Sequence, residues 1–229
     1  MKALVDYRIK DVFLNYIEEK KVECIKVKCK NVYDEVSGHP DIFFTVINGK
    51  LVKASNVETS ENVIGINGEN VENGYPNTAK YNICVNNKYA IGNFKYVEKN
   101  IKIIIESSDL EKISVNQGYT RCSLFSIDET HYITSDLGIK KKLEDKGLNV
   151  LYIMSNNIRL LDKNSNYSKM NGFIGGALFK LKNNIVLFGD ISKLEQGIEL
   201  KEYIENLGYN FIYFEGEEVI DYGSVIFLN

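Results

Sequence analysis

A unit made of two short apolar runs, an amphipathic stretch and a third apolar run recurs along this chain, and the repeat constrains the fold more than any single motif does. The clearest copy covers residues 173–214, where two apolar runs flank Lys182-Asn183-Asn184 as strands flank the turn of a β-hairpin. The next stretch predicts a helix, because apolar residues recur at i, i+3, i+4 and i+7. These residues are Leu200, Tyr203, Ile204 and Leu207. Gly208 suits the helix end, and residues 211–214 predict the closing strand.

A second copy of the unit covers residues 121–153. Apolar runs at 122–127 and 132–134 predict a hairpin, and Ser135 and Asp136 are both candidate caps for the short helix that follows. Residues 150–153 predict the closing strand. The order of elements is therefore the same as in the first copy.

The segment 37–117 is less regular, and we count two units in it, one of them degenerate. A hairpin is expected across residues 39–54, with Asn48-Gly49 at its turn. A long polar loop follows, roughly from 56 to 80. Residues 97–105 suit a helix, but their run of isoleucines suits a strand equally well, so both alternatives stay open.

The two ends of the chain supply complementary pieces of one further unit. Residues 221–229 supply a first strand alone, whereas residues 2–28 supply a strand, a helix and a strand. We predict that this helix places five apolar residues on one face. They are Ile9, Val12, Phe13, Tyr16 and Ile17. Joining the ends would complete the unit and cover strand edges that each piece would otherwise expose.

Counting the joined ends as one unit gives about five units of ~45 residues each, a period typical of repeat architectures. At 229 residues the chain is expected to form one α/β domain that spans residues 1–229. We expect its β-β-α-β units to close into a small propeller, with the ring completed by the N- and C-termini.

Four of the units begin with a short motif that leads into the first strand. The motifs are His39-Pro40-Asp41-Ile42-Phe43-Phe44, Arg121-Cys122-Ser123-Leu124-Phe125, Gly175-Gly176-Ala177-Leu178-Phe179 and Asp221-Tyr222-Gly223-Ser224-Val225-Ile226-Phe227. In a propeller the starts of the first strands converge on the central axis. We therefore expect these residues to meet in one pocket.

Three of the motifs resemble those of the guanidine-modifying enzymes, the pentein superfamily, which includes arginine deiminases, agmatine deiminases and dimethylarginine dimethylaminohydrolases. The resemblance implies a five-bladed propeller of β-β-α-β units. It implies that Cys122 is the nucleophile, His39 the catalytic base and Asp221 the acid. It also implies that Asp41 binds the guanidinium group. In the superfamily the three motifs follow one another along the chain as acid, His and Cys, whereas here the order is His, Cys and acid. The two orders are related by a circular permutation, in which the chain ends fall inside the hairpin of the acid motif. The Lys-, Asn- and Ile-rich composition also resembles that of a clostridial family with this arrangement.

The chemistry that the resemblance implies needs an activated thiol. A guanidinium carbon is a poor electrophile, and a thiolate is the strongest nucleophile that a side chain offers near neutral pH. Because a free cysteine has a pKa of about 8.5, an imidazolium such as His39 or the neighbouring Arg121 is needed to populate the thiolate. Arg121 is alternatively a ligand for a substrate carboxylate. The implied reaction is hydrolysis at a guanidino, amidino or ureido carbon through a covalent intermediate, with no cofactor and no metal.

The motifs also depart from the superfamily pattern. Ser224 stands where a second acid is usual, and Gly175-Gly176-Ala177 stand where another guanidinium-binding Asp is expected. The absence of these two acids leaves three alternatives open. The substrate is less cationic than arginine, another acid takes the place of the missing ones, or the site is inactive. Two further functions stay open: an amidinotransferase, or a non-catalytic binding module such as the superfamily's ribosome anti-association factor. In purely structural terms, Cys122 suits a small buried hydrophobe, and the motif acids suit turn caps.

Composition and charge exclude several classes of partner. The 28 basic and 31 acidic residues give a net charge of −3 and form no basic stripe, so neither nucleic acid nor a membrane is an expected partner. No apolar run approaches the ~20 residues of a membrane-spanning helix, and the N-terminus carries no apolar signal segment. Four cysteines without zinc-like or disulfide-like spacing indicate reduced thiols and a cytoplasmic protein. The expected partner is a small guanidino or amidino compound, and the oligomeric state stays open.

Overall fold

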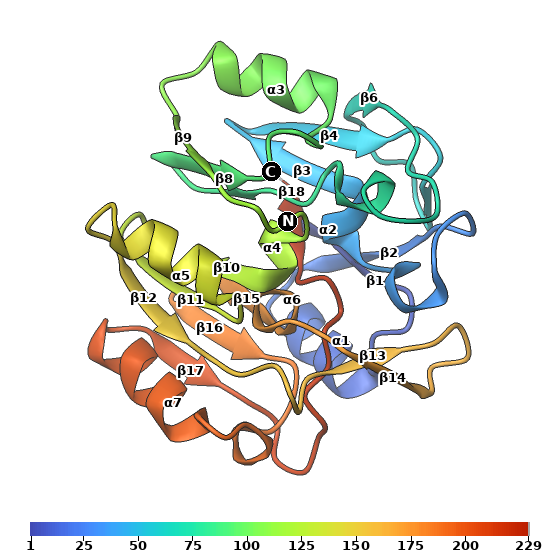
Figure 1. Ribbon diagram of the computed structural model, residues 1–229. Helices are drawn as coiled ribbons and strands as arrows, with labels where there is room; N and C mark the ends of the chain where they lie inside the picture. Colours follow the sequence, from blue (N-terminus) through green and yellow to red (C-terminus); the bar gives the residue numbers. More distant parts are fainter. Residues whose placement is uncertain (229) are drawn as a thin grey trace.

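The computed structural model describes residues 1–228 and is a mixed α/β fold of several small sheets, with no closed barrel in that range (Figure 1). Five sheets within the described chain repeat one order, in which a first strand is antiparallel to a second and the second is parallel to a third. Their strands are β18 (Ile226–Leu228), β1 (Lys2–Asp6) and β2 (Glu23–Lys28); β3 (Phe44–Ile47), β4 (Lys50–Ala54) and β6 (Ile66–Gly68); β7 (Cys84–Val85), β8 (Tyr89–Gly92) and β9 (Glu111–Ser114); β10 (Leu124–Ser126), β11 (His131–Thr134) and β12 (Asn149–Tyr152); and β15 (Leu178–Leu181), β16 (Asn184–Leu187) and β17 (Asn210–Ile212).

Helices connect the second and third strands in four of these sheets. They are α1 (Asp11–Glu19), α3 (Lys99–Glu106), α5 (Leu137–Glu144) and α7 (Gly197–Asn206). The sheet β3-β4-β6 has no α-helix at this point, and its connection instead forms β5 (Glu58–Thr59), which pairs with β2. This is the degenerate unit that the sequence pattern predicts. Three short 3-10 turns complete the connections: η1 (Asp34–Val36), η2 (Asn77–Ala79) and η3 (Ile191–Lys193).

The two ends of the chain pair with each other. β1 and β18 run antiparallel, with Lys2 opposite Leu228 and Leu4 opposite Ile226. The N- and C-terminal labels accordingly lie close together in Figure 1. The prediction that the chain ends complete one unit is confirmed by this pairing, which covers the edge that β1 would otherwise expose.

Several turn and cap signals are confirmed. Asn48 and Gly49 have φ angles of 49° and 74°, as a two-residue hairpin turn between β3 and β4 requires. Asp136 caps α5 by accepting a hydrogen bond from the Ile139 backbone N–H at 2.8 Å. Gly208 follows α7 with a φ of 84°, a backbone conformation that suits the end of a helix.

The sequence left both helix and strand open at residues 97–105, and the structure forms the helix α3 there. Glu98 caps it, and its carboxylate accepts a hydrogen bond from the Ile101 backbone N–H at 3.0 Å. Ile101, Ile104 and Ile105 are buried, so a helical i, i+3, i+4 stripe faces the core. The cap and the stripe together outweigh the β-propensity of isoleucine.

Three of the predicted strand starts are one-turn helices. The residues that open the motifs form α2 (Pro40–Phe43), α4 (Thr120–Ser123) and α6 (Ile174–Ala177), and the strands begin only afterwards. Pro40 at the first position of α2 favours this turn, because its ring presets the helical φ. The prediction that strands begin at these motifs is therefore wrong by about one turn.

Two further predictions need correction. Val12 is 40% exposed and does not share the core-facing side of α1, where Phe13 and Ile17 are buried and Tyr16 is half-buried. The strand expected at 211–214 ends at Ile212. The sequence pattern also does not predict the hairpin of β13 (Arg159–Leu161) and β14 (Tyr167–Asn171).

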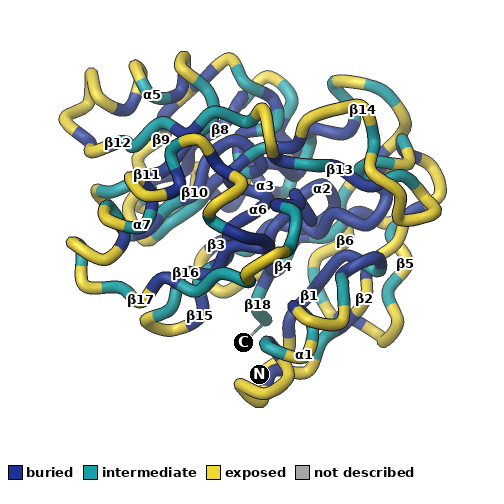
Figure 2. Tube along the Cα trace, turned by 90° about the horizontal axis from the view of Figure 1, so that it is seen from below, coloured by how far each residue is buried: buried dark blue, intermediate teal, exposed yellow. Residues whose placement is uncertain are grey.

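The three one-turn helices lie at the centre of the molecule, with the sheets around them (Figure 1). Figure 2 shows the same centre as buried, whereas the exposed residues follow the outer turns. Within residues 1–228, no helix is long and apolar enough to cross a bilayer.

Candidate active site

Three segments, each placed just before the first strand of a different sheet, bring polar side chains to the buried centre. His39 is the N-cap residue of α2, Cys122 lies in α4, and Asp221 precedes β18. The three residues are 1%, 3% and 2% exposed. Residues far apart in the sequence therefore share one closed interior.

The thiol of Cys122 is held by two neighbours. Its Sγ donates to Asp41 Oδ2 at 2.9 Å, and Asn82 Nδ2 donates to the Sγ at 3.1 Å. The Asn82 amide also accepts from the Cys122 backbone N–H at 3.1 Å and donates to the Asp41 carbonyl at 3.1 Å. One side chain thus fixes α4 against α2. The sequence motifs do not include Asn82. It lies two residues before β7, just as Cys122 lies two residues before β10, and this equivalent position could have identified it.

The imidazole of His39 lies between two carboxylates. Its Nδ1 is 3.7 Å from Asp221 Oδ1, and its Nε2 is 3.9 Å from Asp6 Oδ2. Neither ring nitrogen has a hydrogen-bond partner within residues 1–228. Donor atoms of His39, Asp41 and Cys122 all lie within 4.8 Å of one another. We call these residues, together with Asp221, the cysteine cluster.

Asp6 belongs to a buried ion pair that no motif in the sequence marks. Arg8 Nε donates to Asp6 Oδ1 at 2.9 Å, and Arg8 Nη2 donates to Asp6 Oδ2 at 2.6 Å. Arg8 Nη1 donates to the carbonyls of Leu161 in β13 and of Asp34, at 2.6 and 2.8 Å. The pair therefore ties the N-terminal strand to the β13-β14 hairpin and holds a carboxylate beside His39.

Glycines make room for Asp221 and His39. A Cβ on Gly176 would collide with the Asp221 carboxylate, and a Cβ on Gly223 would lie 2.5 Å from His39 Cβ. Gly223 also has a φ of 68°, which favours glycine. Asp221 accepts hydrogen bonds from the backbone N–H groups of Phe173 and Gly223, each at 2.9 Å. Gly175 also has no room for a side chain, because a Cβ there would lie 2.3 Å from the Arg121 carbonyl oxygen.

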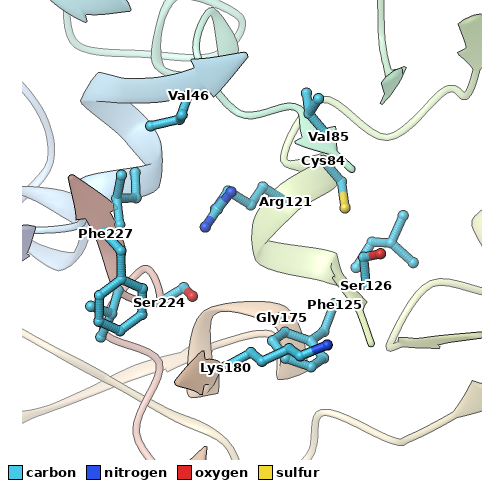
Figure 3. Close-up of a pocket in the computed structure, with 13 residues that line it drawn as sticks. Val46, Cys84, Val85, Arg121, Phe125, Ser126, Gly175, Lys180, Ser224 and Phe227 are labelled. Atoms are coloured by element: carbon cyan, nitrogen blue, oxygen red, sulfur yellow. The ribbon is translucent and has the colours of Figure 1, made fainter. Parts of the chain in front are cut away.

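Arg121 lines a separate cavity of about 280 Å³, which Figure 3 shows with its lining residues. Gly175 and Ser224 also line it, whereas Cys122, His39 and Asp221 do not. The first strands of all five repeated sheets contribute to its wall, so we call it the axial cavity. The contributing strand residues include Val46 in β3, Val85 in β7, Phe125 in β10, Lys180 in β15 and Phe227 in β18. The structure thus does not place Arg121 in the same cavity as the thiol.

Comparison with known proteins gives a family without a described activity. Residues 4–226 match a family of unknown function, DUF6873. The chain belongs to this family. No curated protein and no solved structure matches it. The matched range of the DUF6873 chain includes the whole cysteine cluster and the residues that line the axial cavity.

Burial controls the charges of the cysteine cluster in this DUF6873 chain. It raises the pKa of Cys122 well above its usual value, and the charges of Asp41 and Asp221 raise it further. Burial and the charge of Arg8 lower the pKa of His39 well below its usual value. The thiol and the imidazole are therefore both neutral at rest, which differs from the expected pairing of a thiolate with an imidazolium.

The two carboxyl groups of the cluster also hold their protons tightly. Burial raises the pKa of Asp221 to about 8, and the nearby charge of Asp41 adds to the effect. Burial raises the pKa of Asp41 to about 6, although the hydrogen bond from Cys122 and the charge of Arg121 oppose the rise. A cation bound among these groups would favour their ionised forms.

The same donor atoms suit a metal ion as well as a reacting carbon. His39, Asp41 and Cys122 offer an imidazole nitrogen, a carboxylate oxygen and a sulfur, which are the ligand types that Zn²⁺ accepts. Asp41 Oδ1 and both nitrogens of His39 are buried without a hydrogen-bond partner in the described chain. These atoms are therefore available to a ligand or a water molecule that reaches the cluster.

Proposed function

We propose that this chain is a hydrolase of the guanidine-modifying type, in which Cys122 attacks a guanidino, amidino or ureido carbon. The observation that carries the proposal is the meeting of Cys122, His39 and Asp221 in one buried cluster. The three residues come from segments before β10, β3 and β18, and the motif resemblance assigns them the roles of nucleophile, base and acid. Asp41, which the resemblance assigns to guanidinium binding, accepts a hydrogen bond from the nucleophile itself.

The proposal includes the architecture of a five-bladed propeller. Five sheets with the same strand order, one of them built from both chain ends, supply five candidate blades in the described chain. The first strand of each sheet contributes to the wall of a single cavity, as the innermost strands of a propeller would. The one-turn helices α2, α4 and α6 then place their side chains at the axis.

The charges of the cluster favour a cationic substrate. Asp41 and Asp221 are completely buried, and Arg8, the nearby cation, is already bonded to Asp6. A guanidinium group entering the cluster would donate charge-assisted hydrogen bonds to these carboxylates and favour their ionised forms. The positive charge of the substrate would also offset the charges of Asp41 and Asp221, which raise the pKa of Cys122. Substrate binding would therefore favour the thiolate form of Cys122.

The proton steps follow from the resting charges. The neutral imidazole of His39 takes the Cys122 proton as the sulfur bonds to the substrate carbon. The resulting imidazolium, oriented by Asp221, gives that proton to the leaving nitrogen as the carbon–nitrogen bond breaks. His39 then takes a proton from a water molecule that attacks the carbon of the thioether-linked intermediate. The carbon–sulfur bond breaks, the proton returns to sulfur, and the resting thiol is restored.

The closed cluster requires an opening motion before substrate can enter. Cys122 is only 3% exposed, and the axial cavity does not reach it. The surrounding segments must therefore separate for turnover, a step that often limits the rate in enzymes with closed sites.

The test is a panel of guanidino, amidino and ureido compounds incubated with the protein while released ammonia and ureido products are measured. We expect turnover by the natural chain and by Cys24→Ala, a control thiol outside the cluster, and none by Cys122→Ala. His39→Gln should remove turnover while leaving the thiol in place. Full turnover by Cys122→Ala would end the proposal.

One observation favours a second candidate, a non-catalytic binding module. The thiol is neutral and buried at rest, and Ser224 and Ala177 stand where the resemblance expects acids. Such a module would bind a guanidinium compound through Asp41 and release it unchanged. Calorimetric binding by both the natural chain and Cys122→Ala, with no product from either, would establish this alternative.

A further inference from the structure

The axial cavity carries positive charge and no negative charge of its own. Arg121 and Lys180 line it, whereas no Asp or Glu does so in the part of the chain that the structure describes. Neither cation lies within ion-pair distance of a carboxylate in residues 1–228. Most Lys residues that form ion pairs in this chain do so at the surface, so two uncompensated cations facing one cavity form a distinct feature.

Arg121 is free to receive a ligand. Its Nε is buried without a hydrogen-bond partner, and its terminal nitrogens make no hydrogen bond within residues 1–228. Figure 3 shows its guanidinium group extending into the open middle of the cavity, toward Ser224 and Phe227. An unsatisfied buried donor costs free energy that a bound acceptor would recover.

Lys180 is held in place beside the cavity. Its Nζ donates to the Ile127 carbonyl at 2.7 Å and to the Tyr209 hydroxyl at 3.1 Å, and it lies 4.3 Å from the centre of the Tyr209 ring. These partners are neutral, so the ammonium charge stays uncompensated. Lys180 therefore adds positive potential at the cavity wall, and Arg121 supplies the free donors.

The remaining walls limit the kind of anion that fits. Apolar residues Val46, Leu124, Phe125, Ile226 and Phe227 form one part of the cavity wall, beside a polar part that includes Ser126 and Ser224. Its volume of about 280 Å³ is at the lower end of the range for small-molecule sites. An inorganic anion would make no use of the apolar part of the wall, whereas a short hydrocarbon chain with one carboxylate would contact both Arg121 and that part.

We propose that the axial cavity binds a small organic carboxylate, with its carboxylate on Arg121 and its hydrocarbon part against the walls formed by the first strands. This site is separate from the cysteine cluster, because the thiol, His39 and Asp221 do not line the cavity. It is next to the cluster, since Arg121 and Cys122 are neighbours in α4. The charge of Arg121 also favours the ionised form of Asp41, so an anion on Arg121 would influence the cluster electrostatically.

The test is calorimetric titration of the natural chain with acetate, butyrate and benzoate, with butyramide as the uncharged counterpart and inorganic phosphate as the doubly charged one. We expect butyrate to bind more tightly than acetate, and at least ten-fold more tightly than butyramide or phosphate. Equal binding of butyrate and butyramide would overturn the proposal without any variant. Tighter binding of phosphate than of every carboxylate would overturn the choice of ligand class.

Variants locate the site. Arg121→Gln should weaken butyrate binding at least ten-fold, whereas Lys182→Asn, which removes a cation from the exposed β15-β16 turn, should leave binding unchanged. Cys122→Ala should also bind butyrate normally, so this result does not depend on whether the cluster is catalytic. Unchanged binding by Arg121→Gln would refute the site. If circular dichroism shows that Arg121→Gln does not fold, Lys180→Met provides the same comparison, with weaker butyrate binding expected and unchanged binding refuting the role of the cavity.

Discussion

Replacing Asp221 with asparagine should make the protein less stable in acid and more stable at neutral pH. Asp221 is completely buried by its surroundings, and its folded-state pKa is about 8 instead of the usual 3.8. Asparagine has nearly the same shape but cannot ionise. The pH dependence of the difference between the two proteins therefore reports the titration of this one carboxyl group.

The sign follows from which state holds the proton. Below about pH 4 the carboxyl group is protonated in both states, and its contribution to stability is fully present. Between about pH 4 and pH 8 the folded state keeps the proton that the unfolded state loses. Each pH unit in this window therefore removes ~1.4 kcal/mol from the stability of the natural chain. From pH 5 to pH 7 the loss due to Asp221 is ~2.7 kcal/mol, and the variant does not suffer it.

The substitution Asp221→Asn also lowers the free energy of unfolding by an amount that does not depend on pH. Asp221 accepts hydrogen bonds from the backbone N–H groups of Phe173 and Gly223, and asparagine can keep only one of its two oxygen acceptors. A buried N–H without an acceptor costs ~1–3 kcal/mol. The stabilities of the two proteins should therefore cross at about pH 4.5–6, with the variant ~2–4 kcal/mol more stable near pH 7.5.

Urea unfolding at pH 5, 6, 7 and 8, followed by circular dichroism, measures this difference. Asp109→Asn is the matched control, because Asp109 is exposed and the charge change is the same. The control should differ from the natural chain by a nearly constant amount over this range. A difference between Asp221→Asn and the natural chain that does not change with pH would refute the raised pKa and the charge state derived from it.

Three other predictions concern the cysteine cluster. Iodoacetamide should alkylate Cys122 more slowly than Cys24 in the unliganded protein, because the Cys122 thiol is buried and its pKa is raised well above normal; fast labelling of Cys122 by peptide mass mapping would contradict the closed site. Non-denaturing amounts of guanidinium should increase the ultraviolet thiolate absorbance of the natural chain but not of Cys122→Ala, and no increase would argue against a cation site beside the thiol. Zn²⁺ should bind the natural chain in competition with a chromogenic chelator and should bind His39→Gln at least ten-fold more weakly, since an imidazole ligand is lost; equal affinities would exclude His39 as a ligand.

Features that depend on neighbouring residues could be predicted from the sequence. The Asn48-Gly49 turn, the Asp136 cap and the end of α7 at Gly208 are determined by local backbone chemistry. The pairing of β1 with β18 is a long-range contact, yet it was predictable because each chain end supplies only part of a repeated unit. The repeated units therefore allowed a contact between residues far apart in the sequence to be predicted.

Other features depend on contacts that no local pattern records. Asp6 lies at the end of an ordinary apolar strand, and only the fold brings it within 3.9 Å of His39. Asn82 acts on Cys122 across 40 residues through hydrogen bonds that have no sequence signature. The neutral resting states of the thiol and imidazole are likewise consequences of complete burial, which the motifs could not show.

The packing around the cluster also explains why no acid stands in α6, where the pentein resemblance leads us to expect one. Asp41, Asn82 and Cys122 place polar side chains toward the centre from α2, the start of β7 and α4, and their hydrogen bonds fill that side. At the corresponding place in α6, a side chain on Gly176 would occupy the position of the Asp221 carboxylate. An aspartate there would therefore displace Asp221 instead of adding a second acid. A side chain at position 176 and the buried carboxylate of Asp221 therefore exclude each other, and under the proposed function Asp41 and Asp221 are the carboxylates of the cluster that would contact the substrate.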